Sequence, residues 1–348
     1  MNTITFKPKQ STKRLLSGLP VRAREVLISR YGLGKDSEKM TLEAIGEKYN
    51  ITRERVRQIE NAALANIRKS AEFKAEKAVF DELEKVFKSM GSVLAEEDFL
   101  NHVSKDAQTQ NHINFLLVLG DPFKRMKEDD DFKHRWYIDE NLSKKVHDSL
   151  KKLYENLSDD DLLPESEIIS AFLENLKDVS EEYKNDEIIR RWLSISKTID
   201  KNPLGEWGVS RSPNVKTKGI RDYAFLAMRK HGSPIHFREV AKAIQEMFNK
   251  KAHVATTHNE LIKDPRFVLV GRGLYALTEW GYLSGVVKDV IKKVVDKNGP
   301  MTKDEIIEKV LKERYVKKNT IIVNLQNPKF FKKDKDGRYS IVEKSKQR

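Results

Sequence analysis

The sequence predicts a mainly α-helical fold, in which an N-terminal helix-turn-helix is followed by tandem winged-helix domains with small β-hairpin wings. Two observations support this fold class. Near the N-terminus, a tight turn separates two stretches whose apolar residues have helical spacing. Over the rest of the chain, one pattern of helices and a closing hairpin recurs. The expected domains are residues 1–71 (helix-turn-helix), 72–140 and 141–210 (winged-helix repeats, the second one weaker), 217–282 (winged helix) and 283–345 (C-terminal winged helix).

The helix-turn-helix is predicted from helix caps and apolar spacing. Threonine is a favourable N-cap because its side chain accepts a hydrogen bond from a backbone N–H group. Thr41 is placed to begin a short helix, and Thr52 a longer one that runs past Lys69. Asn50 and Ile51 form the turn between them. In such a pair the second helix enters the major groove of DNA by its N-terminal end.

The leading turns of that second helix carry side chains suited to reading bases. The candidate base readers are Arg53, Glu54, Arg57 and Gln58. They lie within about 140° of the helix circumference. Arg can bind guanine through two hydrogen bonds, Gln suits adenine, and Glu accepts a hydrogen bond from cytosine. A merely solvated helix can carry the same residues, so this face alone leaves both interpretations open.

Three segments of the remaining chain share one pattern. A glycine ends a helix, an Asp-Pro or Asn-Pro pair later breaks another helix, and two short strands follow. The glycines are Gly91, Gly232 and Gly299. A weaker copy is expected between the first two. Three helices followed by a hairpin predict a winged helix.

Charge divides the chain into three parts. Residues 1–71 hold 15 Lys and Arg against 7 Asp and Glu, a net charge of +8. Residues 72–210 hold 20 against 31, net −11, and residues 211–348 hold 31 against 15, net +16. Basic surfaces favour DNA because neutralised phosphates release condensed counterions. The alternative is that these charges only keep a helical protein in solution. The candidate contacts to the DNA backbone or a partner protein in the basic C-terminal part are Arg272, Lys317 and Lys318.

Several other classes of protein are disfavoured. The absence of cysteine excludes disulfides, thiolate catalysis and zinc fingers. The eight histidines lack metal-ligand spacing, and no phosphate-binding glycine loop is present. The acidic runs at 128–131 and 159–161 are expected to be solvated turns, not a nuclease site. No apolar stretch approaches the ~20 residues of a membrane span, and the first residues lack the apolar core expected of a signal peptide. We expect a cytoplasmic, nucleoid-associated protein that is not an enzyme and uses no metal, cofactor, small-molecule substrate or membrane.

The N-terminal segment resembles region 4 of sigma-70-type transcription factors over residues 15–70. The matching strings are residues 19–27, 30–33, 40–46 and 52–64. In that family the second helix reads the −35 promoter element, and the domain packs on the flap of RNA polymerase. The resemblance implies double-stranded DNA and the polymerase core as partners. It implies base reading by the four residues above, and backbone or partner contacts by Thr41, Thr52 and Arg55.

This segment departs from a primary sigma factor in two respects. Region 4 closes the chain of a primary sigma factor, whereas here the similar segment opens it. No later segment resembles region 2, whose aromatic-rich helix captures the melted −10 strand. We therefore expect that the protein does not open promoters by itself.

Residues 219–282 resemble the HARE-HTH winged-helix family. Its members include the N-terminal domain of the RNA polymerase delta subunit, Asx-like chromatin proteins and DNA-binding parts of some restriction systems. The resemblance rests on residues 221–224, 232–240, 264–267 and 271–275. It implies a module associated with nucleic acid or polymerase and implies no chemistry.

The leading interpretation is a sigma-factor-like DNA-binding transcription regulator that recognises promoter DNA of the −35 type and contacts RNA polymerase. One alternative is a polymerase-associated protein like the delta subunit, for which DNA contact is secondary. Another is a DNA-binding subunit of a restriction or modification system. Retention of polymerase after nuclease treatment would favour the first alternative, and a neighbouring nuclease or methyltransferase gene the second.

Overall fold

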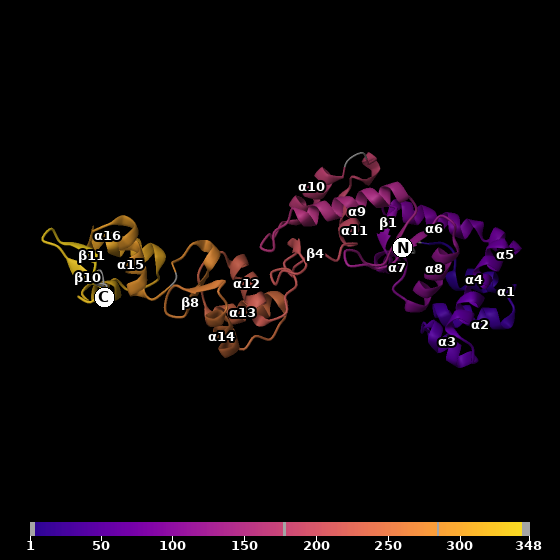
Figure 1. Ribbon diagram of the computed structural model, residues 1–348, viewed down its shortest axis with the longest axis horizontal. Helices are drawn as coiled ribbons and strands as arrows, with labels where there is room; N and C mark the ends of the chain where they lie inside the picture. The colour runs from indigo at the N-terminus through magenta and orange to yellow at the C-terminus, as the bar shows by residue number, and fades with distance from the viewer. Residues whose placement is uncertain (1–3, 177–178, 284, 343–348) are drawn as a thin grey trace, which may run out of the picture. The chain divides into compact units, whose positions relative to one another are not determined.

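The computed structural model describes residues 4–176, 179–283 and 285–342. These residues are mainly helical and form small antiparallel sheets, which confirms the predicted α-rich class (Figure 1). The chain divides into two compact units, Met1–Lys201 with Gly205–Ser212, and Asn202–Leu204 with Pro213–Arg348. Parts of the expected domains, residues 1–3, 177–178, 284 and 343–345, lie outside the described residues.

The first unit begins with six helices, of which the third and fourth form the predicted helix-turn-helix. The second helix ends at Gly32, whose φ of 63° gives the left-handed conformation that favours glycine. The turn that follows the third helix is made at Asn50, also left-handed with a φ of 54°. The helices are α1 (Pro8–Ser17), α2 (Val21–Tyr31), α3 (Leu42–Tyr49), α4 (Arg53–Lys69), α5 (Ala71–Ala75) and α6 (Lys77–Ser89).

After α6, the first unit runs twice from helices into a small antiparallel sheet. In the first sheet β3 lies between β1 and β2, with Leu94 opposite Trp136. The second sheet pairs β4 with β5. The elements are β1 (Val93–Ala95), α7 (Glu96–Val103), α8 (Ala107–Leu119), β2 (Lys124–Met126), β3 (Arg135–Tyr137), α9 (Glu140–Glu155), α10 (Glu165–Asn175), η1 (Glu181–Tyr183), α11 (Asp186–Leu193), β4 (Ile199–Lys201) and β5 (Trp207–Val209).

The second unit twice repeats a helix, a short strand, two helices and a hairpin. Its sheets have the strand orders β6-β8-β7 and β9-β11-β10, with the last strand in the centre as in β1-β3-β2. Three segments therefore share one connectivity and one sheet order. The elements are α12 (Ile220–His231), β6 (Ile235–His236), α13 (Phe237–Phe248), α14 (Val254–Lys263), β7 (Phe267–Leu269), β8 (Leu274–Leu277), η2 (Thr278–Trp280), α15 (Val287–Asn298), β9 (Met301–Thr302), α16 (Lys303–Glu313), α17 (Lys318–Leu325), β10 (Phe331–Lys333) and β11 (Arg338–Ile341).

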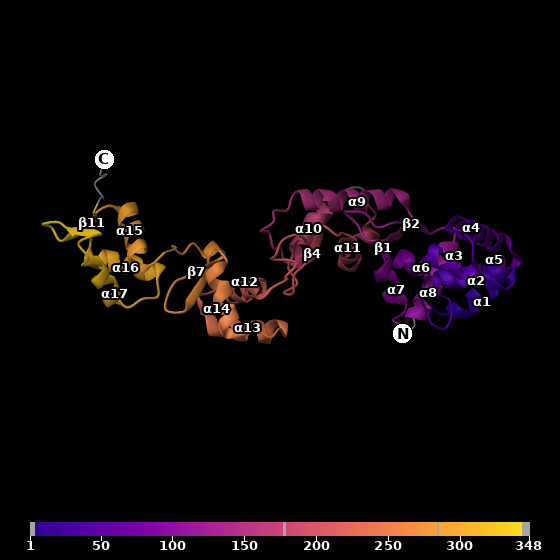
Figure 2. The same cartoon turned by 60° about the horizontal axis from the view of Figure 1, so that its bottom comes forward.

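The hydrophobic core of the N-terminal helices continues into the helices after them. One cluster of buried side chains joins Leu27 of α2, Ile67 of α4, Phe87 of α6 and Phe115 of α8. The ring of Tyr31 meets that of Phe115 edge to face, with centroids 5.1 Å apart. Figures 1 and 2 both show α8 among the N-terminal helices, and it packs against α1, α2 and α4. The helix-turn-helix and the segment after it therefore share one core.

Hydrogen bonds from side chains strengthen this junction. The amide of Asn111 on α8 donates to the carbonyl of Gly32 at 3.1 Å and to that of Ser37 at 2.8 Å. Arg68 of α4 donates from Nε to the carbonyl of Leu119 at 3.2 Å. Carbonyl groups at helix ends lack partners within their own helix. The bonds to Gly32 and Leu119 satisfy such groups at the ends of α2 and α8.

We expect Phe115→Ala to lower the free energy of unfolding of the first unit by about 3–5 kcal/mol, because it leaves a cavity in the shared core. Phe115 is completely buried. Amide hydrogen exchange should then accelerate in α2 as well as in α8. Val21→Ala, at a side chain that is 66% exposed, is the control and should change stability by no more than about 0.5 kcal/mol. Unchanged exchange in α2 would contradict a shared core.

Candidate nucleic-acid interface

The angle between α3 and α4 depends on a close approach at Gly46. The N–H group of Ile51 donates to the carbonyl of Gly46 at 2.9 Å. A Cβ atom added to Gly46 would lie 2.6 Å from the carbonyl oxygen of Ile51, closer than real Cβ contacts. Asn50 supplies the left-handed residue between the helices, a conformation in which Asn is enriched. The local sequence therefore fixes the geometry of this turn.

Both helices begin at the predicted N-caps. The hydroxyl oxygen of Thr41 accepts a hydrogen bond from the N–H of Ala44 at 3.1 Å. The hydroxyl oxygen of Thr52 accepts from the N–H of Arg55 at 3.2 Å. Each cap satisfies one of the N–H groups that a helix leaves without an internal partner. Both threonines remain exposed, and Thr52 lies directly before the leading turn of α4.

A small apolar cluster holds α4 from its inner side. Val26 of α2, Ile45 of α3 and Val56 of α4 are completely buried. Helical spacing puts Val56 on the opposite side of α4 from the candidate base readers. This cluster therefore turns the charged face of α4 outward.

A buried carboxylate adds a polar anchor that the sequence analysis missed. Glu60 of α4 is 9% exposed and accepts a hydrogen bond from the Tyr31 hydroxyl at 2.9 Å. Nε of Arg30 lies 3.7 Å from the same carboxylate oxygen. Burial, followed by the charge of Glu60, raises the pKa of Tyr31, so the hydroxyl keeps the proton that it donates. The position of Glu60 one turn after Val56 is the signal that could have predicted its inward direction.

The structure places the four predicted base readers together on the first two turns of α4. All four side chains are exposed: Arg53, Glu54, Arg57 and Gln58. Arg55 is exposed at the same end and donates to the side-chain oxygen of Gln58 at 3.1 Å. Nothing in the described part of the first unit packs over this face, because its residues all remain open to solvent.

Two ion pairs orient these side chains before any partner is bound. Arg57 donates to both carboxylate oxygens of Glu54, at 2.9 and 2.7 Å. The hydrogen bond from Arg57 is the largest cause of the lowered pKa of Glu54, which therefore stays ionised. Nη1 of Arg53 lies 2.8 Å from Oε1 of Glu43 on α3. Water screens such exposed pairs strongly, so their side chains can exchange partners at small cost.

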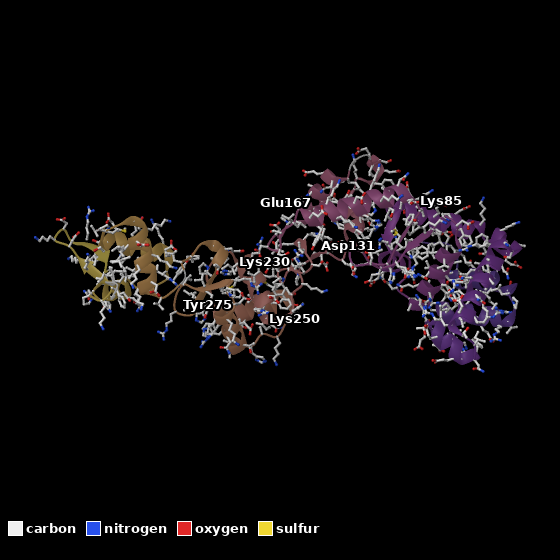
Figure 3. The ribbon with its side chains drawn as sticks, viewed as in Figure 1. Lys85, Asp131, Glu167, Lys230, Lys250 and Tyr275 are labelled. Carbon is white, nitrogen blue, oxygen red and sulfur yellow. The ribbon has the colours of Figure 1, made fainter. Side chains whose placement is uncertain are left out.

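The remaining candidate contacts belong to the second unit. Arg272 is exposed in the turn between β7 and β8, and Lys317 and Lys318 are exposed at the N-terminal end of α17. Other exposed cations of this unit include Lys230 and Lys250 (Figure 3). The second unit therefore presents positive charge from two of its sheet-containing segments.

Histidines and carboxylates do not gather into a metal site in the described ranges. The buried His147 illustrates a structural role, since its Nε2 accepts a hydrogen bond from Nε of Arg135 at 2.8 Å. Burial, with the charge of Arg135, lowers the pKa of His147 to about 4. Among the helices that the structure describes, none has the length and apolar character of a membrane span.

Comparison with known proteins gives matches at the N-terminal helices. Residues 15–69 match the family model for sigma-70, region 4. RNA polymerase sigma factor SigA of Nostoc sp. (strain PCC 7120) is 47% identical over 60 residues, which are 17% of this chain and 15% of that protein. Sigma factor SigA1 of Synechococcus elongatus is 48% identical over 60 residues, with the same two shares. Sigma factor SigA of Microcystis aeruginosa is 47% identical over 60 residues, 17% of this chain and 14% of its own length.

The chain thus spans about 15% of the length of the curated relatives it matches. The predicted similarity to region 4 is confirmed for the segment that carries α2, α3 and α4. This segment is similar to region 4 of sigma factors.

Gly46→Ala should destabilise the helix-turn-helix by about 1–3 kcal/mol, because the new methyl group forces Ile51 away. Gly34→Ala is a matched control, since a Cβ there would meet Ile28 at an ordinary distance of 3.7 Å. Amide hydrogen exchange of α3 and α4 measures the local effect in the full chain. Equal protection in the two variants would contradict the close approach at the turn.

Proposed function

We propose that the chain is a sigma-factor-like transcription regulator that recognises promoter DNA of the −35 type through α4 and has no catalytic role. One observation carries the proposal: the segment that matches sigma-70 region 4 presents an exposed polar face at the start of α4. This face holds the residue types that read base edges in the major groove. The proposed location is the cytoplasm, in association with the nucleoid.

In the proposed complex α4 enters the major groove by its N-terminal end. Arg57 and Gln58 leave their intramolecular partners and bind base edges. Glu54, once released from Arg57, accepts a hydrogen bond from cytosine. Arg53 exchanges its partner Glu43 for a base or a phosphate. Contacts to the DNA backbone come from Thr41, Thr52 and Arg55. Because the inner side of α4 is buried, these exchanges require no movement of the helix.

The rest of the chain is proposed to form tandem winged helices. The common connectivity and the central last strand in three sheets support this arrangement. The segment from α12 to β8 is the proposed HARE-HTH module. Its turn residue Arg272, together with Lys317 and Lys318, would contact phosphates, consistent with the net charge of +16 over residues 211–348.

The proposed protein partner is the RNA polymerase core, including its flap. Since α8 packs against α1, α2 and α4, a partner would meet the polar remainder of these helices and α3. A pull-down with the full chain tests this contact. Retention of polymerase after nuclease treatment would show a direct contact, and its loss with the DNA would restrict the protein to a DNA-mediated role. A sigma-like regulator is expected to combine this retention with sequence-specific DNA binding, whereas retention without such binding would favour the delta-subunit-like alternative.

The double variant Arg57→Ala with Gln58→Ala should remove sequence preference more than total binding, because base contacts specify and phosphate contacts position. Binding-site selection followed by competition with random DNA measures both quantities. The control is Gln10→Ala with Arg211→Ala, which removes the same residue types from exposed positions outside α4. An equal loss of affinity on every sequence would refute base reading by this face.

The triple variant of Arg272, Lys317 and Lys318 to Gln should weaken binding to all sequences alike. Each lost phosphate contact is expected to reduce the slope of log affinity against log salt concentration by about 1. Titrations of one DNA duplex at several salt concentrations give this slope. An unchanged slope in the triple variant would show that these side chains do not contact the DNA backbone. If binding by the unaltered protein does not depend on salt, the proposal that the protein binds DNA is contradicted.

A further inference from the structure

A cavity of about 350 Å³ opens between α1, α2 and α8, away from the charged face of α4. Its apolar lining comes from Leu16 of α1, Ile28 of α2 and Leu33 after α2. The volume lies in the range of small-molecule sites, whose walls are mainly apolar with a few polar groups. None of the candidate DNA contacts lines this cavity.

Two polar side chains in the lining, Thr12 and His112, are buried and lack a hydrogen-bond partner within the described residues. The atoms without a partner are the hydroxyl oxygen of Thr12 and both ring nitrogens of His112. Thr12 is 1% exposed and His112 is 3% exposed. Such groups nearly always have a partner, either protein or water. Burial, with the charge of Lys9, lowers the pKa of His112, so the ring is neutral at pH 7 and offers one donor and one acceptor.

The charged residues that line the cavity are all cationic. They are Lys9 and Lys13 of α1 and Arg24 of α2. Arg24 donates from Nη2 to the carbonyl of Leu19 at 3.3 Å, whereas its Nε is buried and has no partner in the described structure. The carboxylate of Asp106, which also acts electrostatically on His112, is engaged by the N–H and hydroxyl of Thr109. The cavity therefore combines apolar walls with a positive edge rich in donors.

We propose that this cavity binds a small organic anion, namely a carboxylate attached to an apolar body. The carboxylate lies at the cationic edge and accepts hydrogen bonds from the donor groups that have no partner among the described residues. The apolar body packs on the leucine and isoleucine walls. A bare inorganic anion would leave those walls empty, and a neutral apolar molecule would leave the cations and donors unused.

Binding here also bears on the helix-turn-helix. Helix α2 lines the cavity, packs against α4, and carries the Tyr31 hydroxyl that binds Glu60. A ligand that joins α1, α2 and α8 therefore stabilises the body on which α4 is mounted. This inference does not depend on DNA recognition, and its test contains no DNA.

Three probes, each added to the full chain, separate the effect of the ligand's carboxylate from that of its apolar body: 4-phenylbutyrate, 4-phenyl-1-butanol and acetate. The readouts are the ring NMR signal of His112, assigned with His112→Gln, and the thermal midpoint of the first unit. The expected result is that phenylbutyrate shifts the His112 signal and raises the midpoint at concentrations where the alcohol and acetate do neither. If His112→Gln does not fold, the His112 signal cannot be assigned, and the thermal midpoint of the unaltered protein decides the test.

Lys9→Gln with Lys13→Gln should weaken phenylbutyrate binding roughly fivefold and leave any binding of the alcohol unchanged, since two exposed charges are lost. Lys35→Gln with Lys74→Gln removes the same charge from exposed positions outside the cavity and should have no effect. The proposal is overturned if no probe shifts the signal or midpoint, which leaves water as the occupant. It is also overturned if the alcohol binds as well as the carboxylate, or if both double variants behave alike.

Discussion

The exposed face of α4 depends on how completely the opposite face is buried. Val56 lies in a small cluster with α2 and α3, Glu60 is held by Tyr31, and Ile67 enters the large core shared with α8. These three contacts follow one another along the inner side of one helix. The helix is therefore fixed in rotation as well as in position. Side chains at its start are presented to solvent in a set direction, and recognition of any partner begins from that direction.

Local signals made much of the fold predictable. Thr41 and Thr52 cap α3 and α4 because capping involves residues only three positions apart. The hairpin of β7 and β8 likewise lies where two short apolar runs, joined by a turn with two glycines, predict it. The two-residue strand β6 escaped prediction, since a strand this short has no periodicity. Its place in the sheet comes from pairing with β8, far along the chain.

The candidate site was predictable in part for the same reason. The exposed residues of α4 follow from helical spacing within one segment. Asn111, which binds Gly32 from 79 positions away, has no signature near α2. The same holds for His112 in the cavity wall, because only the packing of α8 brings it to α1 and α2. The form of the helix-turn-helix was therefore predictable from local sequence. Its surroundings were not, because they depend on packing between segments that are far apart in the chain.

The shared core has an electrostatic consequence under the proposed function. It ties the basic N-terminal helices to the start of residues 72–210, a stretch with a net charge of −11 that belongs to the same unit except for residues 202–204. A duplex attracted by α4 is thus also repelled by carboxylates that cannot move away independently. Repulsion of this kind acts on every sequence equally and lowers the affinity for random DNA. The correct bases must then supply a larger share of the binding free energy. Attachment to an acidic neighbour therefore favours selection of the correct sequence over tight binding to DNA of any sequence.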